Sequence, residues 1–203
     1  MIDTLIFDFG DVFINLDKQG AMQNALNLFK METFEKDMIT TNMLYEVGKI
    51  TTEEFIEFYK LKFPYLEDQQ IVKAWNYILR DFPKYRLEFL QKIAQENRYK
   101  IILLSNTNDM HIDYIKSNIS FYEEFKGCFD AFYLSQEIQL RKPNQEVFDF
   151  VLENNNLNPE HCFFVDDTKE NTDMAESLGI KVWNIDETRE DVIDLFNLKN
   201  IYF

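Results

Sequence analysis

The 203-residue sequence predicts an α/β fold, with a Rossmann-like parallel sheet core and a small helical bundle inserted after the first strand. After Pro83, short apolar runs alternate with helical patterns, as in a parallel sheet covered on both faces. Residues 18–80 instead repeat apolar residues at helical spacing and contain no strand-like β-branched run. We therefore expect an α/β core domain of residues 1–17 and 81–203 and a helical domain of residues 18–80.

The first element is a buried strand at Leu5–Phe7, because this short apolar run stops at the polar Asp8. Four helices follow. Thr51 and Thr52 before two acidic residues indicate one helix start, since hydroxyls cap helices and acids favour the first turn. The four helices are marked by Leu26, Phe29 and Phe34; Met43, Leu44 and Val47; Phe55, Ile56, Tyr59 and Leu61; and Ile71, Trp75, Ile78 and Leu79.

The second part of the chain alternates helices with strands. Gly179 is typical of a helix end, and it precedes the last expected strand. Helices are expected at 84–97, after 107, at 144–155 and up to Gly179, and strands at 101–104, 131–134, 162–165 and 181–183.

Composition limits the possible partners. The formal net charge is −15, which argues against a nucleic acid, whose phosphates need a basic patch. A phosphorylated substrate must then be attracted locally, by a metal ion or a few cationic side chains. No eighteen apolar residues run together and no secretory leader is visible, so we expect a cytoplasmic protein without a membrane span. Cys128 and Cys162 are expected to be buried and unpaired.

Polar residues terminate the apolar runs, and in an open parallel sheet these ends meet in one crevice. The set combines an attacking carboxylate, hydroxyl and amide donors, a cation and a carboxylate pair, which is what phosphoryl transfer requires. In chain order these residues are Asp8, Ser105, Asn106, Thr107, Lys142, Asp166 and Asp167.

At these residues the sequence resembles the haloacid dehalogenase (HAD) superfamily. Four motifs carry the resemblance in the family's order and spacing, and the helical block falls where the family places its cap. The residues within these motifs most resemble those of the branch that contains α-glucose-1-phosphate phosphatase and the phosphatase domain of soluble epoxide hydrolases. The motifs are Asp8-Phe9-Gly10-Asp11-Val12, Leu104-Ser105-Asn106-Thr107, Arg141-Lys142-Pro143, and Phe164-Val165-Asp166-Asp167 with Asn171.

The resemblance implies a Mg²⁺-dependent phosphatase that acts on a small phosphorylated metabolite through an aspartyl-phosphate on Asp8. Ser105 and Lys142 are then catalytic, while Asn106 and Thr107 bind the substrate phosphate. The metal is held by Asp8, the Gly10 carbonyl and Asp167, with Asp166 acting through water or behind the ligands. A sugar phosphate is the expected substrate by analogy only. Oligomeric state is not predicted.

Several residues keep a second interpretation. Asp8 and the acidic pair are also typical of turns and helix caps, although adjacent acids repel without a cation between them. Ser105 is also a possible helix cap, and Lys142 a solvated lysine before a proline. Asn171 is either a first-turn helix residue or a support for the acidic loop. His111 is a packed or surface histidine, with substrate contact as the alternative; Tyr45, Trp75 and Tyr77 fit a core better than a pocket.

Gly10 departs from the family pattern, which usually has a second Asp there as general acid and base. Loss of such a group typically costs about 10²–10⁴ in rate. The nearest branch shares the glycine, and the adjacent Asp11 is a candidate substitute. Two other functions therefore stay open: a phosphate-binding or regulatory module with little or no turnover, and a 2-haloacid dehalogenase, against which the Asp166-Asp167 pair argues. A bacterial receiver domain is excluded, since its acidic pair follows the first strand.

Overall fold

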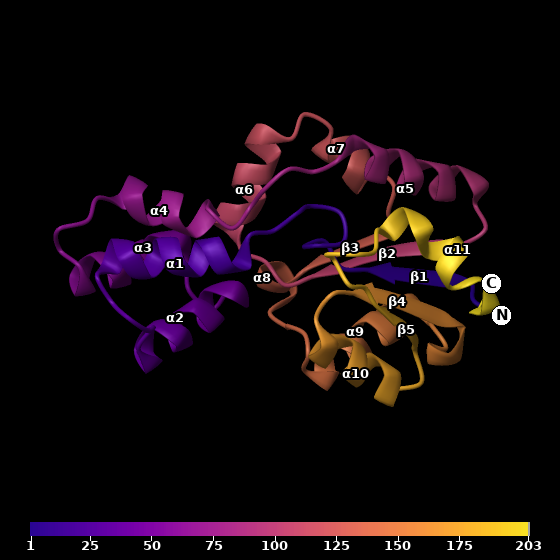
Figure 1. The fold of residues 1–203 in the computed structure, drawn as a ribbon. Helices are drawn as coiled ribbons and strands as arrows, with labels where there is room; N and C mark the ends of the chain where they lie inside the picture. The colour runs from indigo at the N-terminus through magenta and orange to yellow at the C-terminus, as the bar shows by residue number, and fades with distance from the viewer. Residues whose placement is uncertain (203) are drawn as a thin grey trace.

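The computed structural model of the protein describes residues 1–202 and contains a five-stranded parallel sheet with helices on both faces (Figure 1). The strand order is β3-β2-β1-β4-β5, so β1 lies at the centre. This arrangement confirms the predicted α/β fold. The strands are β1 (Thr4–Phe7), β2 (Lys100–Ser105), β3 (Ala131–Leu134), β4 (Cys162–Asp166) and β5 (Lys181–Asn184).

Side chains of the central strand point alternately to two apolar layers, as the pleat of a strand requires. Leu5 and Phe7 join the layer under α5, α6, α7 and α11, whereas Ile6 joins the layer under α9 and α10 (Figure 1). Both layers exclude water, which is why β1 is apolar at successive positions. These helices are α5 (Lys84–Glu96), α6 (Asp109–Asn118), α7 (Tyr122–Lys126), α9 (Gln145–Asn155), α10 (Lys169–Ser177) and α11 (Leu195–Leu198).

Short segments complete the part of the chain that the structure describes. A one-turn helix follows β3, and three 3-10 turns lie before β4 and near the carboxyl end. They are α8 (Ser135–Ile138), η1 (Pro159–His161), η2 (Val192–Asp194) and η3 (Asn200–Tyr202). None of the helices within residues 1–202 is long and apolar enough to cross a membrane.

Four helices between β1 and α5 form a separate cluster, which we call the helical unit; the rest is the sheet unit (Figure 1). Its centre is aromatic: Phe55 stacks on Tyr45 with ring centroids 4.4 Å apart and meets Trp75 edge-on at 4.7 Å. Thr51 and Glu54 form a capping box at the predicted helix start. The helices are α1 (Lys18–Phe29), α2 (Lys36–Glu46), α3 (Thr52–Lys62) and α4 (Asp68–Asn76).

Two crossings join the helical unit to the sheet unit, and they lie side by side as a short antiparallel ribbon. The Asn15 amide donates to the Asp81 carbonyl and the Arg80 amide to the Asn15 carbonyl, both at 2.9 Å. The Asp17 amide donates to the Ile78 carbonyl at 2.9 Å, and the Arg80 guanidinium pairs with the Asp17 carboxylate at 2.6 Å. The start and end of the helical unit are therefore direct neighbours.

The two cysteines are free, as expected, but only one is buried. Cys162 lies inside β4 and is inaccessible. Cys128 is half-buried at the end of α7, where its thiol donates to the Glu124 carbonyl. The expected burial of Cys128 was wrong because the chain turns outward there, before β3 begins.

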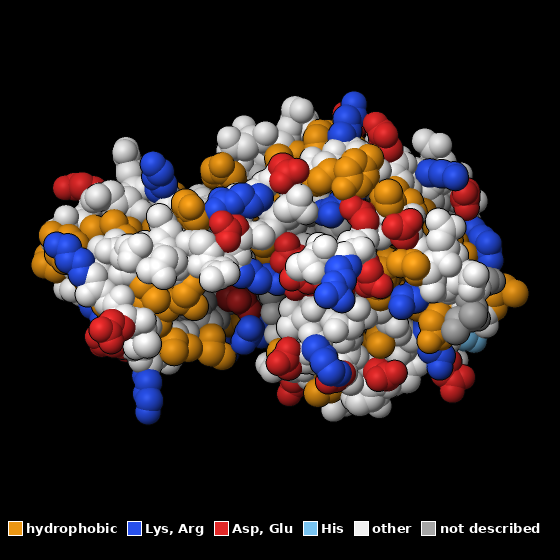
Figure 2. Space-filling view, in the orientation of Figure 1, with side chains coloured by type: hydrophobic (Ala, Val, Ile, Leu, Met, Phe, Trp, Pro, Cys, Tyr) orange, Lys and Arg blue, Asp and Glu red, His pale blue; other side chains and the backbone are white. Residues whose placement is uncertain are grey.

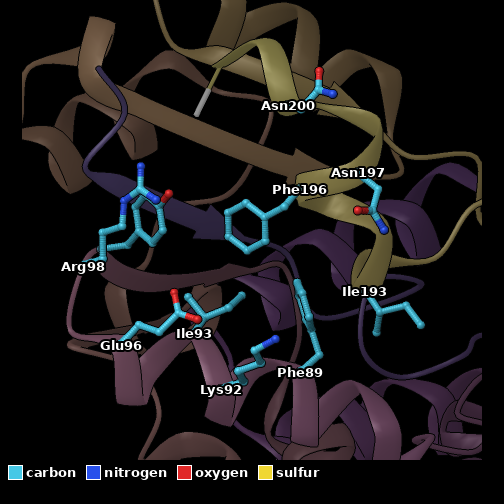
Figure 3. Close-up of a pocket in the computed structure, with 10 residues that line it drawn as sticks. Phe89, Lys92, Ile93, Glu96, Arg98, Ile193, Phe196, Asn197 and Asn200 are labelled. Atoms are coloured by element: carbon cyan, nitrogen blue, oxygen red, sulfur yellow. The ribbon is translucent and has the colours of Figure 1, made fainter.

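A cavity of about 520 Å³ lies between α5 and α11, near the amino end of β2 (Figure 3). Phe89 and Ile93 of α5 and Phe196 of α11 supply apolar wall, and Lys92 and Glu96 supply charge. Its lining shares no residue with the carboxyl ends of the strands, so it is separate from the site described next.

Candidate active site

The carboxyl ends of three central strands lie level, because Phe7 of β1 is in register with Leu103 of β2 and Val165 of β4. Asp8 follows β1 directly, Ser105 ends β2 and Asp166 ends β4. Beside them is a cavity of about 350 Å³, in the region between the two units where Figure 2 shows acidic and basic side chains gathered. Its lining includes Asp8, Gly10, Lys18, Asn106, Arg141, Lys142, Asp167 and Asn171.

Lys142 is the central cation, and its side chain is completely buried. The Nζ atom lies 2.8 Å from Asp8 Oδ1 and 2.6 Å from Asp166 Oδ2. Burial disfavours the ammonium form, but the Asp166 and Asp8 carboxylates more than offset that effect and raise the pKa of Lys142 above its usual value. Burial raises the pKa of Asp8, against the pull of Lys142. This geometry excludes the solvated-lysine interpretation.

Asn106 holds the backbone of Lys142 from both sides. Its amide nitrogen donates to the Lys142 carbonyl at 2.8 Å, and its oxygen accepts from the Lys142 amide at 2.9 Å. The position of the buried ammonium is thus set by the end of β2 as well as by its own loop.

Asp166 is fully buried, and each of its oxygens has a partner. Oδ1 accepts from the Thr168 amide at 2.8 Å and from the Asn171 side chain at 3.0 Å. Oδ2 accepts from Asn171 at 3.0 Å and from Lys142. Both interpretations of Asn171 therefore apply, since it lies in the first turn of α10 and also supports the acidic loop.

Asp167 faces the cavity and pairs with Lys18, the first residue of α1. Lys18 also lies 2.9 Å from Asp11 Oδ2, so this ammonium bridges two carboxylates. Burial raises the pKa of Asp167, although Lys18 lowers it. A cation of the helical unit is therefore placed beside the acidic cluster of the sheet unit.

Three carboxylates converge on one point: Asp8, Asp166 and Asp167 each offer an oxygen, and these atoms lie within 4.8 Å of one another. Gly10 lines the same cavity, and its carbonyl accepts no hydrogen bond from residues 1–202. Mg²⁺ prefers such all-oxygen donor sets. The side chains present therefore fit a magnesium ion.

Ser105 and Thr107 line a smaller cavity of about 180 Å³ that adjoins the first one at Gly10 and Asn106. The Thr107 amide donates to the Ser135 hydroxyl at 2.9 Å, and that hydroxyl lies 2.6 Å from the Glu46 carbonyl at the end of α2. The loop after β2 is thereby tied to the helical unit.

Neither Gly10 nor Asp11 places a free carboxylate at the position of the family's usual second Asp. A Cβ atom at position 10 would lie 2.7 Å from Leu16 Cδ1, so Leu16 fills the space of a side chain there. Asp11 has a left-handed backbone, with φ of 55°, and its Oδ1 accepts from the Leu16 amide at 2.8 Å. Because Oδ2 pairs with Lys18, both Asp11 oxygens are engaged in holding the loop.

Comparisons with known proteins identify the family of the chain. A family model described as haloacid dehalogenase-like hydrolase matches residues 2–179. The chain belongs to the haloacid dehalogenase-like hydrolase family. The resemblance of the four motifs is thereby confirmed, and with it the expectation of a hydrolase.

Three relatives of this HAD-like chain are informative. It is 26% identical to a D-ribitol-5-phosphate phosphatase of Bacteroides thetaiotaomicron, over 90% of this chain and 91% of that protein. A HAD family enzyme of the same species, solved with magnesium and inorganic phosphate, is 33% identical, with a TM-score of 0.83 over 97% of this chain and 100% of that one. A HAD-like hydrolase of Porphyromonas gingivalis shares the fold at 23% identity and a TM-score of 0.79, over 99% and 98% of the two chains.

His111 lies in the first turn of α6, at the joint between the two units of this HAD-like protein. Its Nε2 donates to the Trp75 carbonyl at 3.1 Å, and its Nδ1 accepts from Asn108 at 3.2 Å. Burial lowers the pKa of His111 to about 4, so the ring is neutral at pH 7. Both ring nitrogens have protein partners, so neither nitrogen is available to bind a substrate.

A third cavity, of about 450 Å³, lies among α1, α2, α4 and the start of α6. It shares Lys18 with the cavity beside Asp8, and Glu46, Asn108 and His111 with the cavity beside Ser105. Tyr45 is buried, as expected, whereas Tyr77 is exposed and Trp75 forms part of the wall of this cavity, so neither lies wholly in a core.

Several residues of this region escaped the sequence analysis. Lys18, Glu46 and Ser135 belong to no motif, and the contacts of Lys18 with Asp167 and of Glu46 with Ser135 join positions far apart in the chain. Arg141 stood inside a motif, but its ion pair with Glu46, 2.5 Å between Nε and Oε1, joins positions 95 residues apart. An Asp-Lys pair at the start of the helical block was the one local sign that Lys18 begins a helix near the site.

Proposed function

We propose that this HAD-like protein is a Mg²⁺-dependent phosphatase of small phosphomonoesters, with Asp8 as its nucleophile. The placement of Asp8 carries the proposal: its carboxylate lies 2.8 Å from the buried Lys142 ammonium and within the cluster of carboxylate oxygens that fits a metal. A strand-end aspartate that only capped a turn would need neither a buried cation nor two further acids.

Asp8, Asp167 and the Gly10 carbonyl would hold the metal directly, and Asp166 would stand behind them. Asp167 lines the cavity, whereas the oxygens of Asp166 are occupied by Lys142, Asn171 and a backbone amide. When bound, Mg²⁺ supplies positive charge that offsets the phosphate charge and the repulsion among the carboxylates.

The chemistry proceeds in two displacements. An Asp8 oxygen attacks phosphorus in line, the bond from phosphorus to the leaving oxygen breaks, and that oxygen takes a proton from a water molecule. Water then attacks the aspartyl-phosphate, releasing inorganic phosphate and restoring the carboxylate. Lys142 holds Asp8 and meets the phosphate charge, while the Ser105 hydroxyl and the segment at Asn106 and Thr107 orient phosphoryl oxygens.

The helical unit would act as the cap, with residues 18–80 forming it and residues 1–17 and 81–203 the core. It supplies Lys18 at the rim of the site and walls the cavity next to it. Closure over the site would exclude bulk water and select the leaving group. We propose a small sugar or polyol phosphate as substrate, supported by the ribitol phosphate relative.

A phosphate-binding module without turnover is the second candidate, because glycine stands at the position of the usual general acid and Leu16 fills the space beside it. Phosphate release from a panel of sugar, polyol and nucleotide monoesters, with Mg²⁺ or with EDTA, separates the two functions. For the phosphatase, we expect release that requires the metal and prefers one ester class.

Asp8→Asn provides the decisive variant. We expect kcat to fall by about 10⁴-fold or more, because the attacking oxygen is replaced. The fold should persist, since Lys142 keeps its pair with Asp166. Asp113→Asn, at an exposed position of α6, is the matched control. Appreciable turnover by Asp8→Asn would rule out the nucleophile, and folded wild type that binds Mg²⁺ and phosphate without turnover would establish the binding module.

A further inference from the structure

The cavity of the helical unit is mostly apolar, but three ionisable side chains reach its lining: Lys18, Glu46 and His111. Carbon–hydrogen faces of a ligand fit walls such as Met22 and Trp75. The charge state of the three polar groups then decides which leaving group is accepted, because a charge inside a partly enclosed space needs a counter-charge.

The cationic and potentially cationic groups of the lining are not available to a ligand. The Lys18 ammonium pairs with both Asp11 and Asp167, and Asp11 remains its partner when Asp167 holds the metal. His111 is neutral, since burial lowers its pKa to about 4 and both its nitrogens have partners. Among residues 1–202, the lining of this cavity offers no cation that lacks a carboxylate partner.

In the part of the chain that the structure describes, the one carboxylate of the lining has a protein partner on only one of its two oxygens. Glu46 ends α2, and its Oε1 accepts from Arg141, which lines the neighbouring cavity. Its Oε2 has no hydrogen-bond partner among the described residues, and the side chain keeps 29% of its surface exposed. Glu46 is therefore a negatively charged hydrogen-bond acceptor at the boundary between the two cavities.

A donor lies beside it on the same helix. Asn42 is one turn before Glu46, so both side chains are on one face of α2, and both line the cavity. The Asn42 oxygen accepts from the Tyr59 hydroxyl at 2.7 Å, which leaves the amide hydrogens for a ligand. An acceptor and a donor at this spacing match the hydroxyl groups of a polyol or sugar.

We propose that Glu46 is the specificity-determining residue of this site, selecting phosphomonoesters of neutral polyhydroxy alcohols and rejecting those whose leaving group carries a carboxylate or a second phosphate. The inference rests on the proposed phosphatase function. Hydroxyls donate to Glu46 Oε2 and accept from Asn42, whereas an anionic leaving group meets the Glu46 charge without a free cation.

Matched pairs of esters test the proposal, because their members differ only in a terminal CH₂OH or carboxylate. Suitable pairs are ribitol 5-phosphate with 5-phosphoribonate and glycerol 3-phosphate with 3-phosphoglycerate. The quantity measured is the ratio of kcat/KM for the neutral and acidic members in Mg²⁺. We expect the wild type to favour the neutral member by about tenfold, because an acidic leaving group faces Glu46 Oε2, the oxygen that Arg141 leaves without a partner.

Two substitutions should move this ratio in opposite directions. Glu46→Gln keeps an acceptor for Arg141 but removes the charge, so we expect the ratio to fall by about tenfold. Arg141→Gln removes the partner of Glu46 and should raise the ratio, and its effect on the phosphate cancels within each pair. Glu57→Gln changes the net charge equally on the exposed face of α3 and should leave the ratio unchanged.

The outcomes separate the two proposals. Turnover of both members with a wild-type ratio near one, or a ratio that Glu46→Gln does not alter, overturns the role of Glu46 and leaves the phosphatase standing. A preference for the acidic members overturns it as well. No turnover of any ester by folded, Mg²⁺-loaded protein overturns the phosphatase, and the specificity proposal with it.

Discussion

The sheet unit and the helical unit differ in what they bury. The sheet unit encloses charge: Lys142 and Asp166 are inaccessible, and each has several polar partners. The helical unit encloses aromatic rings, among them Phe55 and Tyr59, which contact each other; the Tyr59 hydroxyl donates to Asn42. Buried charge is costly unless it is fully paired, so a buried charged cluster indicates a reactive site. Packed aromatic rings instead fix the shape of the helical unit. We infer that the sheet unit supplies reactivity and the helical unit supplies selection.

The largest expected effect tests the buried charge of the sheet unit. Lys142→Met leaves Asp8 and Asp166 without their shared cation. The free energy of unfolding in EDTA should fall by about 3–5 kcal/mol, because uncompensated charge remains buried. Phosphate release should be lost as well. Urea denaturation and the ester assay measure the two consequences.

The pH dependence of this loss has a definite sign. Burial already raises the pKa of Asp8, and removal of Lys142 takes away the group that lowers it. When folding raises the pKa of a carboxyl group, the folded state becomes less stable as pH rises above the pKa of that group in the unfolded chain. The deficit of Lys142→Met should therefore be smaller at pH 5 than at pH 8. Lys84→Met, at an exposed position of α5, is the control; a deficit independent of pH would contradict the explanation.

The corresponding test in the helical unit is Phe55→Ala. Phe55 is fully buried and contacts three other rings, so the cavity left behind should cost about 3–5 kcal/mol of stability. Inhibition by inorganic phosphate should change by less than about twofold, since Phe55 lines neither cavity at the strand ends. Loss of inhibition by inorganic phosphate in Phe55→Ala would break the division of labour between the units.

The smallest effect tests the joint at His111. The folded pKa of about 4 lies below the usual 6.5, so the unfolded chain takes up a proton first as pH falls. The contribution of the neutral His111 to the free energy of unfolding is therefore present above pH 6.5 and is lost as pH falls toward 4. The stability advantage of wild type over His111→Gln should shrink by about 2 kcal/mol from pH 7 to pH 5. His161→Gln, at the exposed second histidine, is the control; an unchanged advantage would contradict a neutral buried ring.

The sheet unit was predictable from sequence because each strand is an apolar run that ends at a polar residue. Asp8 and Asp166 occupy such ends, and parallel strands bring these ends together whatever the intervening chain does. The helical unit was predictable only as helices. Asn42 and Glu46 look like ordinary solvated helix residues, and only the folded arrangement places them beside a cavity.

Contacts between the units were the least predictable part. Glu46 meets Arg141 and Ser135, and Lys18 meets Asp167, across 89 to 149 residues of chain. No local pattern encodes such pairs, because they depend on how the two units dock. Gly10 was visible as a departure, but the Leu16 side chain that fills its space was not.

The paired crossings at Asn15–Asp17 and Ile78–Asp81 bear on how such a molecule can change over time. Because the two ends of the helical unit are hydrogen-bonded neighbours, a short turn suffices to close the chain if the unit is removed. A different insert with adjacent ends can take the same place without disturbing the sheet. Because we propose that the helical unit selects the leaving group, its exchange at these two points should alter the substrate range, while the residues at the strand ends stay on the sheet unit.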